Sequence, residues 1–292
     1  MAIIRIEAEA KVDDLKAKSK IRTVHIDTSV QIERCKAYRK AQIVNKSLQH
    51  FPFKSTSSYA KYEFKAAWLR DLTYLYSASQ KVSQVEELYG YIDDKLNANL
   101  KTRNRLSRCL QAMESFLSKI EWDISPRTYF VRLQSHIRNT ILGAYTWWNQ
   151  SITHEYGGTG CVRAFEEPRE LLGGKIDCSI PQCRPNNINC AIHEFFKKNE
   201  ELFTSIAIAI ESLSDNASKE LKEAKKIIED AKKNPNYLCD DRVCRKLGDV
   251  LIAIDGVDMD CFAANNDKEW GLLSKVLGKE LINPVRDAKT LS

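Results

Sequence analysis

Two features of exported and membrane-bound proteins are absent from this 292-residue sequence. No apolar run approaches the roughly 20 residues that span a bilayer as a helix. The opening residues, MAIIRIEAEAKVDD, are too acidic and too briefly apolar for a signal peptide. We therefore expect a cytoplasmic protein with no membrane segment. Its nine cysteines would be mostly reduced, and their odd number argues against a complete disulfide framework.

Short motifs that identify nucleotide or zinc sites are also absent. The stretch GGTG at Gly157–Gly160 lacks the Lys-Ser/Thr ending of a phosphate-binding loop. The cysteines do not form the paired CxxC pattern of common zinc sites. Three thiols and an imidazole could still hold a structural zinc ion: Cys178, Cys183, Cys190 and His193. Reduced thiols in a loop are the alternative interpretation.

What is present is the composition of an ordinary soluble globular protein, with 29% charged and 43% hydrophobic residues. A chain of this length buries a sizeable core in one or two domains. The formal net charge of +6 is mild but concentrated, because Lys95–Arg138 holds nine basic and three acidic residues. This excess permits contact with nucleic-acid phosphates. A solvated helix face explains the same charges equally well.

Several short segments have the composition of strands. Thr23–Ile26 is a β-branched run, Cys261–Ala264 is short and apolar, and Glu280–Ile282 offers a last strand. Weaker patterns in Ala2–Lys18 predict one strand and one short helix. The stretch Phe51–Ser58 combines a proline with a serine cluster, which predicts a loop.

The rest of the chain is mainly helical. Apolar residues recur at spacings of three and four from about Gln80 to Trp148, and His193–Leu213 and Ala217–Lys232 continue the pattern. Residues 154–189 differ, because they form a long stretch rich in glycine, proline and cysteine. Such stretches are usually functional, flexible or held by a metal.

Acidic residues accompany several of these elements. Asp27 follows the strand Thr23–Ile26, and Glu63 lies one turn inside a helix that begins near Ser57. Viewed singly, Asp27 is most simply a helix cap and Glu63 a partner of the helix dipole. Asp249 interrupts an apolar helical pattern, where an ionised carboxylate is costly without a partner.

The acids have a joint interpretation. Asn266 and Asp267 follow the strand Cys261–Ala264, and open α/β sheets place their sites at the carboxyl ends of parallel strands. Three or four carboxylates at one edge would repel one another unless a divalent cation neutralised them. Oxygen ligands suit Mg²⁺ or Mn²⁺. Such an ion can activate water and stabilise the charge that develops on a phosphate.

The order of these segments resembles the PIN-domain nucleases. VHIDTSV at Val24–Val30 is similar to the opening strand and first acid of that family, and SSYAKYEF at Ser57–Phe64 to the helix with the second acid. LGDVLIAI at Leu247–Ile254 resembles the helix with the third acid. FAANNDKEW at Phe262–Trp270 and LGKELINP at Leu277–Pro284 resemble the closing elements.

The resemblance implies a three-layer α/β core with a short parallel sheet. It carries the metal acids over to Asp27, Glu63 and Asp249. The fourth position falls on Asn266, with Asp267 beside it as the alternative acid. The implied cofactor is Mg²⁺ or Mn²⁺, and the implied substrate is RNA. Many family members are toxins with a protein antitoxin, so an antitoxin-type partner is also implied.

The resemblance covers about half of the chain, roughly its two ends. Far more residues lie between Glu63 and Asp249 than a compact PIN domain places there. We therefore predict a discontinuous core formed by residues 1–79 and 236–292. The predicted helical insertion, residues 80–235, carries both the basic segment and the loop at 154–189.

Two functions are consistent with these features. The first is a metal-dependent endoribonuclease, in which Asp27, Glu63 and Asp249 hold the ion and the basic segment holds the RNA backbone. The alternative is a non-catalytic PIN-like module that binds RNA or a protein. The presence of Asn266, where a fourth carboxylate would be wanted, favours this alternative.

Overall fold

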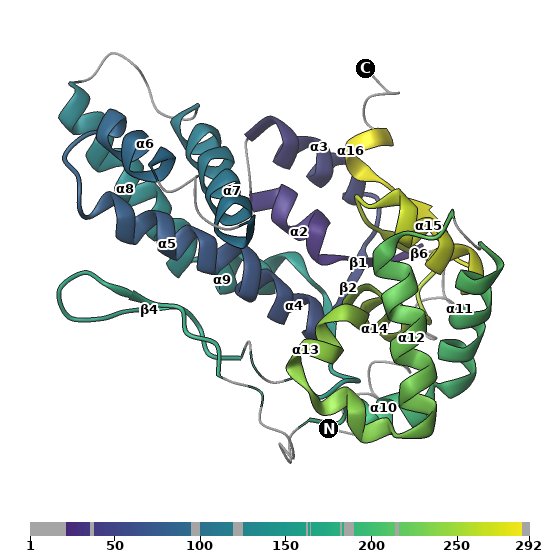
Figure 1. The fold of residues 1–292 in the computed structure, drawn as a ribbon. Coiled ribbons are helices and arrows are strands. Elements are labelled where there is room, and N and C mark those ends of the chain that lie inside the picture. The colour runs from purple at the N-terminus through teal and green to yellow at the C-terminus, as the bar shows by residue number, and fades with distance from the viewer. Residues whose placement is uncertain are drawn as a thin grey trace.

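A sheet of five short strands, with helices around it, is the centre of the computed structural model, which describes residues 22–35, 38–94, 100–118, 125–161, 163, 165–181, 183, 190–213 and 216–287. The elements predicted in Ala2–Lys18 lie outside these residues. The strands form one parallel sheet with helices on both faces, so the predicted α/β architecture with a short parallel sheet is confirmed (Figure 1). None of the helices described is long and apolar enough to cross a membrane.

The sheet has the strand order β3-β2-β1-β6-β7. β1 (Thr23–Ile26) lies in the middle, between β2 (Phe53–Ser57) and β6 (Cys261–Ala263). β3 (His154–Tyr156) and β7 (Glu280–Ile282) form the two edges. Every pairing is parallel, so the carboxyl ends of all five strands lie along the same edge of the sheet.

One strand comes from the segment predicted as a loop. The loop prediction for Phe51–Ser58 is wrong, because Phe53–Ser57 forms β2 beside the central strand. Its hydroxyl groups are buried but have partners: Thr56 Oγ1 donates to the carbonyl oxygen of Ile26 at 2.7 Å, and Ser57 Oγ donates to Asp255 at 2.6 Å. Hydrogen bonding of this kind removes the cost that normally keeps hydroxyl groups out of a core.

The two faces of the sheet bury different residues. Val24 and Ile26 of β1 pack with α2 (Thr28–Cys35) and α3 (Tyr38–Leu48) in one buried cluster. The ring of His25, which alternates with them, lies so close to Gly256 that an added methyl group would overlap it. Gly256 ends α14 (Gly248–Asp255), so α14 covers the opposite face. Successive strand residues point to opposite faces, and this alternation sets the two layers.

A group of helices extends from one side of the sheet (Figure 1). α4 (Ser58–Phe64) follows β2 and continues through a π-helical turn, Lys65–Leu69, into α5 (Arg70–Ser79). Ser57 caps α4, since its Oγ accepts a hydrogen bond from the backbone nitrogen of Tyr59 at 3.0 Å. The other members of the group are α6 (Val85–Asp93), α7 (Leu100–Leu117), α8 (Pro126–Leu142) and α9 (Ala144–Ser151).

The helices on the other side of the sheet come from the second half of the chain (Figure 1). The stretch predicted as one helix, His193–Leu213, forms two, which Asn199 separates. The elements of this half are α10 (Ile192–Lys198), α11 (Glu200–Ser212), α12 (Lys219–Lys233), a 3₁₀ turn (Pro235–Cys239), α13 (Asp241–Cys244), a second 3₁₀ turn (Arg245–Leu247), α15 (Asp267–Val276) and α16 (Pro284–Asp287).

The predicted insertion is continuous with the sheet. β3 lies inside residues 80–235 and pairs with β2 as a member of the main sheet. The same stretch also forms a small antiparallel pair, β4 (Arg169–Glu170) and β5 (Ile176–Asp177). One buried cluster joins residues of both predicted parts, including Leu106, Ile206 and Leu251. The segment therefore contributes an edge strand and core residues as well as its helices.

Candidate functional site

Asp27 is the first residue after the central strand, at the carboxyl edge of the sheet. It caps α2, because its Oδ2 accepts hydrogen bonds from the backbone nitrogen of Ser29 at 3.0 Å and from Ser29 Oγ at 2.5 Å. The residue is only 3% exposed, and its second oxygen, Oδ1, is buried without a hydrogen-bond partner among the described residues. The simple cap interpretation accounts for one carboxylate oxygen and leaves the other unexplained.

Glu63 reaches the same region from α4. Its Oε2 accepts a hydrogen bond from Thr28 Oγ1 at 2.9 Å, which ties it to the residue after Asp27. Its Oε1 occupies the space in which a side chain at position 248 would lie, because a Cβ added to Gly248 would overlap it. A glycine at the start of α14 is therefore what allows this carboxylate to approach the helix.

Asp249 and Glu269 complete an acidic cluster that we define as Asp27, Glu63, Asp249 and Glu269. Asp249 lies in the first turn of α14, and Glu269 in the first turn of α15. The two carboxyl groups are neighbours, because Glu269 contributes to the raised pKa of Asp249. Glu269 also accepts hydrogen bonds from Asn266 Nδ2 and, at 3.3 Å, from Ser218 Oγ.

Burial and mutual repulsion keep protons on this cluster. Burial, followed by the charge of Asp27, raises the pKa of Glu63 to about 8, although the hydrogen bond from Thr28 opposes the shift. Burial also raises the pKa of Asp249, and Asp27, Glu63 and Glu269 add to the effect. The pKa of Asp27 rises for the same first reason, against the hydrogen bonds from Ser29. Concentrated acids of this kind are common at functional sites.

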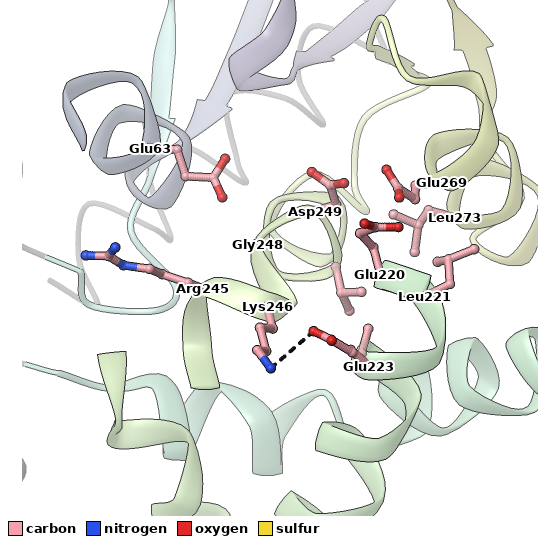
Figure 2. Close-up of a pocket in the computed structure, with 12 residues that line it drawn as sticks. Glu63, Glu220, Leu221, Glu223, Arg245, Lys246, Gly248, Asp249, Glu269 and Leu273 are labelled. Atoms are coloured by element: carbon pink, nitrogen blue, oxygen red, sulfur yellow. Dashed lines mark ion pairs between the residues drawn. The ribbon is translucent and has the colours of Figure 1, made fainter. Parts of the chain in front are cut away.

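The cluster opens into a pocket of about 280 Å³ (Figure 2). Glu63, Asp249 and Glu269 line it, and α12 adds two more acids, Glu220 and Glu223. Two basic residues, Arg245 and Lys246, also line the pocket. The Lys246 ammonium group pairs with Glu223 at 3.1 Å, and Arg245 pairs with Asp241 at 2.9 Å. Among the ion pairs described, both bases therefore pair with acids outside the cluster.

The structure brings together most of the predicted site. Asp27, Glu63 and Asp249 are close enough to shift one another's pKa, and Asn266 reaches the cluster through Glu269. Asp267 lies apart, because its carboxylate accepts a hydrogen bond from Asn283 at 2.9 Å and pairs with Arg286 at 2.8 Å. Glu269 takes the acidic position on α15 instead.

Sequence reasoning missed Glu269, although a signal was present. The residue lies three positions after Asn266, on the same face of α15, and directly before the buried Trp270. Trp270 fixes the first turn of α15 against the core, and that turn begins a few residues after β6 ends. An acid in this turn, such as Glu269, therefore lies near the carboxyl end of β6. The pattern Asn266-x-x-Glu269 makes Glu269 a candidate beside Asp267 but does not decide between the two acids.

The four predicted zinc ligands are spread over separate places. Cys178 is buried near Lys65 and Thr73, and His193 lies beside Glu194 at 3.9 Å. Cys183 and Cys190 line a small pocket with two other cysteines, Cys161 and Cys244. Among the residues described, no group of three or more His, Cys, Asp or Glu side chains is arranged so that it could hold a metal ion. Zinc binding stays a prediction. The side chains of the acidic cluster, as they lie here, are not arranged around a common point where an ion could bind.

Comparison with known protein families, curated proteins and solved structures found no match to this chain. The functional argument therefore depends on the chemistry of the acidic cluster and of the surface around it.

Proposed function

We propose that this chain is a metal-dependent endoribonuclease with a PIN-like core, and that the acidic cluster is its active site. The observation that carries the proposal is the meeting of four acids, two of them buried and two half-buried, at the carboxyl edge of a parallel sheet. They come from segments as distant as Asp27 and Glu269. Maintaining such a group costs stability, because buried like charges repel one another. A function at this edge of the sheet gives a reason for that cost.

The donor set fits a hard divalent cation. Carboxylate oxygens are the ligands that Mg²⁺ and Mn²⁺ prefer, and the buried Oδ1 of Asp27 has no other described partner. Asp27, Glu63, Asp249 and Glu269 would hold the ion, which would have to draw them closer together. When bound, the ion would supply Lewis-acid chemistry at a phosphodiester.

The chain's own groups have separate tasks in this proposal. Thr28 orients Glu63 through the 2.9 Å hydrogen bond to Oε2, and Asn266 orients Glu269. In the metal-free protein Glu63 has a pKa of about 8, so binding of an ion to its carboxylate near neutral pH would release a proton. Asp27 is buried, which keeps water away from its carboxylate and strengthens its electrostatic interactions.

The decisive experiment is cleavage of a mixed RNA substrate with Mn²⁺, with EDTA, and by the Asp249→Asn protein. We expect cutting that requires Mn²⁺ and is lost in Asp249→Asn. Asp267→Asn is the matched control, because it changes an acid of α15 that is bound to Arg286 outside the pocket. Full activity in a pure, folded Asp249→Asn protein would contradict the proposal.

A second candidate is a non-catalytic binding module. The observation that favours it is that no group of acids within the described residues is already arranged around a point where an ion could lie. The two candidates differ in thermal unfolding. Stabilisation by Mn²⁺ that disappears in Asp27→Ala supports a metal site. RNA binding without any effect of Mn²⁺ on stability or on the RNA supports the binding module.

A further inference from the structure

A second hollow, of about 640 Å³, lies next to the acidic pocket. Arg245 lines both, so the two spaces share a wall. Four arginines line the second hollow, and we name it the arginine hollow: Arg70, Arg163, Arg242 and Arg245. Arg70 begins α5, and Arg163 belongs to the segment predicted as an insertion, so residues far apart in the sequence contribute to one basic surface.

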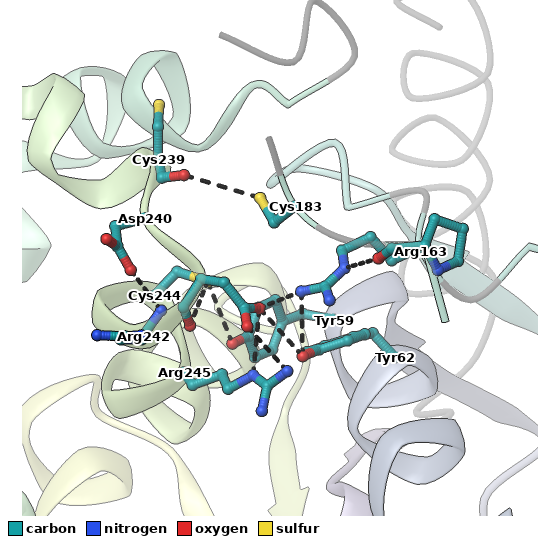
Figure 3. A network of polar contacts seen from close by, with 11 residues as sticks. Tyr59, Tyr62, Arg163, Cys183, Cys239, Asp240, Arg242, Cys244 and Arg245 are labelled. Atoms are coloured by element: carbon teal, nitrogen blue, oxygen red, sulfur yellow. Dashed lines mark hydrogen bonds and ion pairs between the residues drawn. The ribbon is translucent and has the colours of Figure 1, made fainter. Parts of the chain in front are cut away.

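Two of these arginines are fixed in place. Asp241 pairs with both Arg163 and Arg245, the latter at 2.9 Å. The two guanidinium groups also lie beside the ring of Tyr62, at 4.7 Å and 5.7 Å from its centre (Figure 3). Ion pairing and cation–π contact together hold these groups in one orientation. One carboxylate thus neutralises part of the charge and makes the basic wall rigid.

The other two arginines have no ion pair within the part of the chain that the structure describes. The second acid of the hollow, Asp240, caps α13 by accepting a hydrogen bond from the backbone nitrogen of Arg242 at 2.6 Å. Arg70 Nε is buried without an acceptor. Burial lowers the pKa of Arg70, and the nearby charges of Arg105 and Arg245 lower it further. An anion in the hollow would supply both the missing acceptor and the missing charge.

The predicted basic segment is less available than its sequence indicates. Arg105 and Arg108 pair with the buried Asp71, at 3.3 Å and 2.5 Å. Arg138 pairs with Glu170. Lys95 and Lys119 lie outside the described residues. Three of the nine basic residues therefore already form ion pairs within the protein. The arginine hollow provides guanidinium groups that could bind phosphate, and it lies next to the acidic pocket.

We propose that the arginine hollow binds the phosphodiester backbone of the RNA strand beside the phosphate that enters the acidic pocket. The inference rests on the proposed ribonuclease function, because it assigns the strand to that pocket. Arg70 and Arg242 bind phosphate oxygens, and Arg163 and Arg245 form the preoriented wall. Guanidinium groups suit this task, since their planar donors match phosphate oxygens in pairs.

The test measures binding without cleavage. The probe is a fluorescein-labelled single-stranded RNA of about 12 nucleotides, titrated in EDTA at several salt concentrations and followed by anisotropy. The variant is Arg70→Gln with Arg242→Gln. Its matched control is Arg127→Gln with Arg132→Gln, which removes the same charge from α8 in the predicted basic segment. Circular dichroism and thermal unfolding verify that both proteins fold.

In the hollow variant we expect the affinity to fall about tenfold or more. The slope of log K against log salt should become shallower by about 1.4, since each contact to single-stranded nucleic acid contributes about 0.7. Unchanged affinity, or an equal loss in the control, would overturn the inference. Inorganic phosphate, added at a concentration equal to that of the phosphate groups in the RNA, should not displace the RNA. Complete displacement would indicate a site for small anions and would also overturn the inference. RNA that binds in the hollow but is never cut would contradict the proposed ribonuclease function and leave the binding inference intact.

Discussion

At the scale of single residues, the acidic cluster depends on Gly248. A side chain there would overlap Glu63 Oε1, the flexible end of a side chain, so Gly248→Ala displaces the carboxylate and leaves the backbone intact. We expect the affinity for Mn²⁺ to fall about 10- to 100-fold, as when other groups that orient metal ligands are removed. Stability of the metal-free protein should hold or rise, because alanine in a helix is favoured over glycine by about 1 kcal/mol.

Titration calorimetry with Mn²⁺ checks this prediction. Gly271→Ala is the control, since Gly271 also lies in a helix and no atom lies within 4 Å of a Cβ added there. Equal Mn²⁺ affinity in Gly248→Ala and the parent protein would show that Glu63 is not a ligand.

Glu63 also predicts how stability depends on pH. Its pKa rises from 4.5 to about 8 on folding, so the folded state binds more protons than the unfolded state between these values. Stability of the metal-free protein should therefore fall as pH rises from about 4.5 to about 8. Thermal unfolding in EDTA over this range measures the effect. Glu63→Gln should flatten the profile, and an unchanged profile would mean that Glu63 does not carry this proton.

His25 predicts the opposite behaviour on the acid side. Burial lowers the pKa of its imidazole from 6.5 to about 3, so the unfolded state binds the extra proton between these values. Stability should decline as pH falls below about 6.5. The same unfolding series, extended to acid pH and run beside His25→Gln, tests this: the variant should lose the part of the decline that His25 causes, and equal slopes in the two proteins would contradict the prediction, since Asp27 and Asp249 act alike in both. Together the two residues place the metal-free optimum in mildly acidic solution.

At the scale of secondary-structure elements, Asp71 attaches α7 to α5. The carboxylate is 1% exposed and accepts Arg108 Nε at 2.5 Å, with Arg105 at 3.3 Å. Asp71→Asn keeps the shape and removes the charge, so it should lower the free energy of unfolding by about 1.5–3 kcal/mol, the usual worth of a hydrogen bond to a charged group. The backbone amides of α7 should also exchange hydrogen faster.

Chemical denaturation and hydrogen exchange measure these two effects. Asp230→Asn is a suitable control, because that acid pairs only with Lys233 of its own helix, at 3.9 Å, among the ion pairs described. A loss of similar size in Asp230→Asn would mean that the effect is not specific to the α5–α7 contact.

The same scale shows what the sequence could and could not predict. The strands at Thr23–Ile26 and Glu280–Ile282 were predictable, because β-branched or apolar runs next to turn residues mark buried strands. β2 was not, since its serine and threonine hydroxyl groups find their hydrogen-bond acceptors in β1 and α14, which are distant in the sequence. β3 is three residues long and owes its pairing to β2, a partner about 100 residues away.

For the candidate site, the sequence predicted three acids of the cluster, Asp27, Glu63 and Asp249, but not the fourth, Glu269. Asp27 and Asp249 were identifiable from a strand end and from an apolar helix. The choice between Asp267 and Glu269 was not, because it depends on Arg286 and Asn283, which bind Asp267 from the segment that follows β7. Tertiary contacts of this kind carry no local signal.

At the scale of the whole molecule, the sheet needs both ends of the chain. β1 pairs with β6, so Val24 lies beside Cys261. A chain that stops at Asp260 lacks β6 and β7 and leaves one side of the central strand unpaired. We expect this form to be largely insoluble, since exposed strand edges promote association. The soluble fraction and circular dichroism, compared with the full chain, measure it. A soluble, folded product would show that β6 is dispensable.

The pairing of β1 with β6 also has a consequence for biosynthesis. The central strand leaves the ribosome early, and its neighbour follows more than 200 residues later, which takes roughly 10–50 s at ordinary elongation rates. During most of that interval β2 is the only neighbouring strand of β1 that has been made, and Asp27 and Glu63 are the only members of the acidic cluster present. Completion of the sheet and creation of the pocket therefore coincide, because β6 leads directly into the helix that carries Glu269. The nascent chain cannot assemble the acidic cluster before Glu269 has been synthesised.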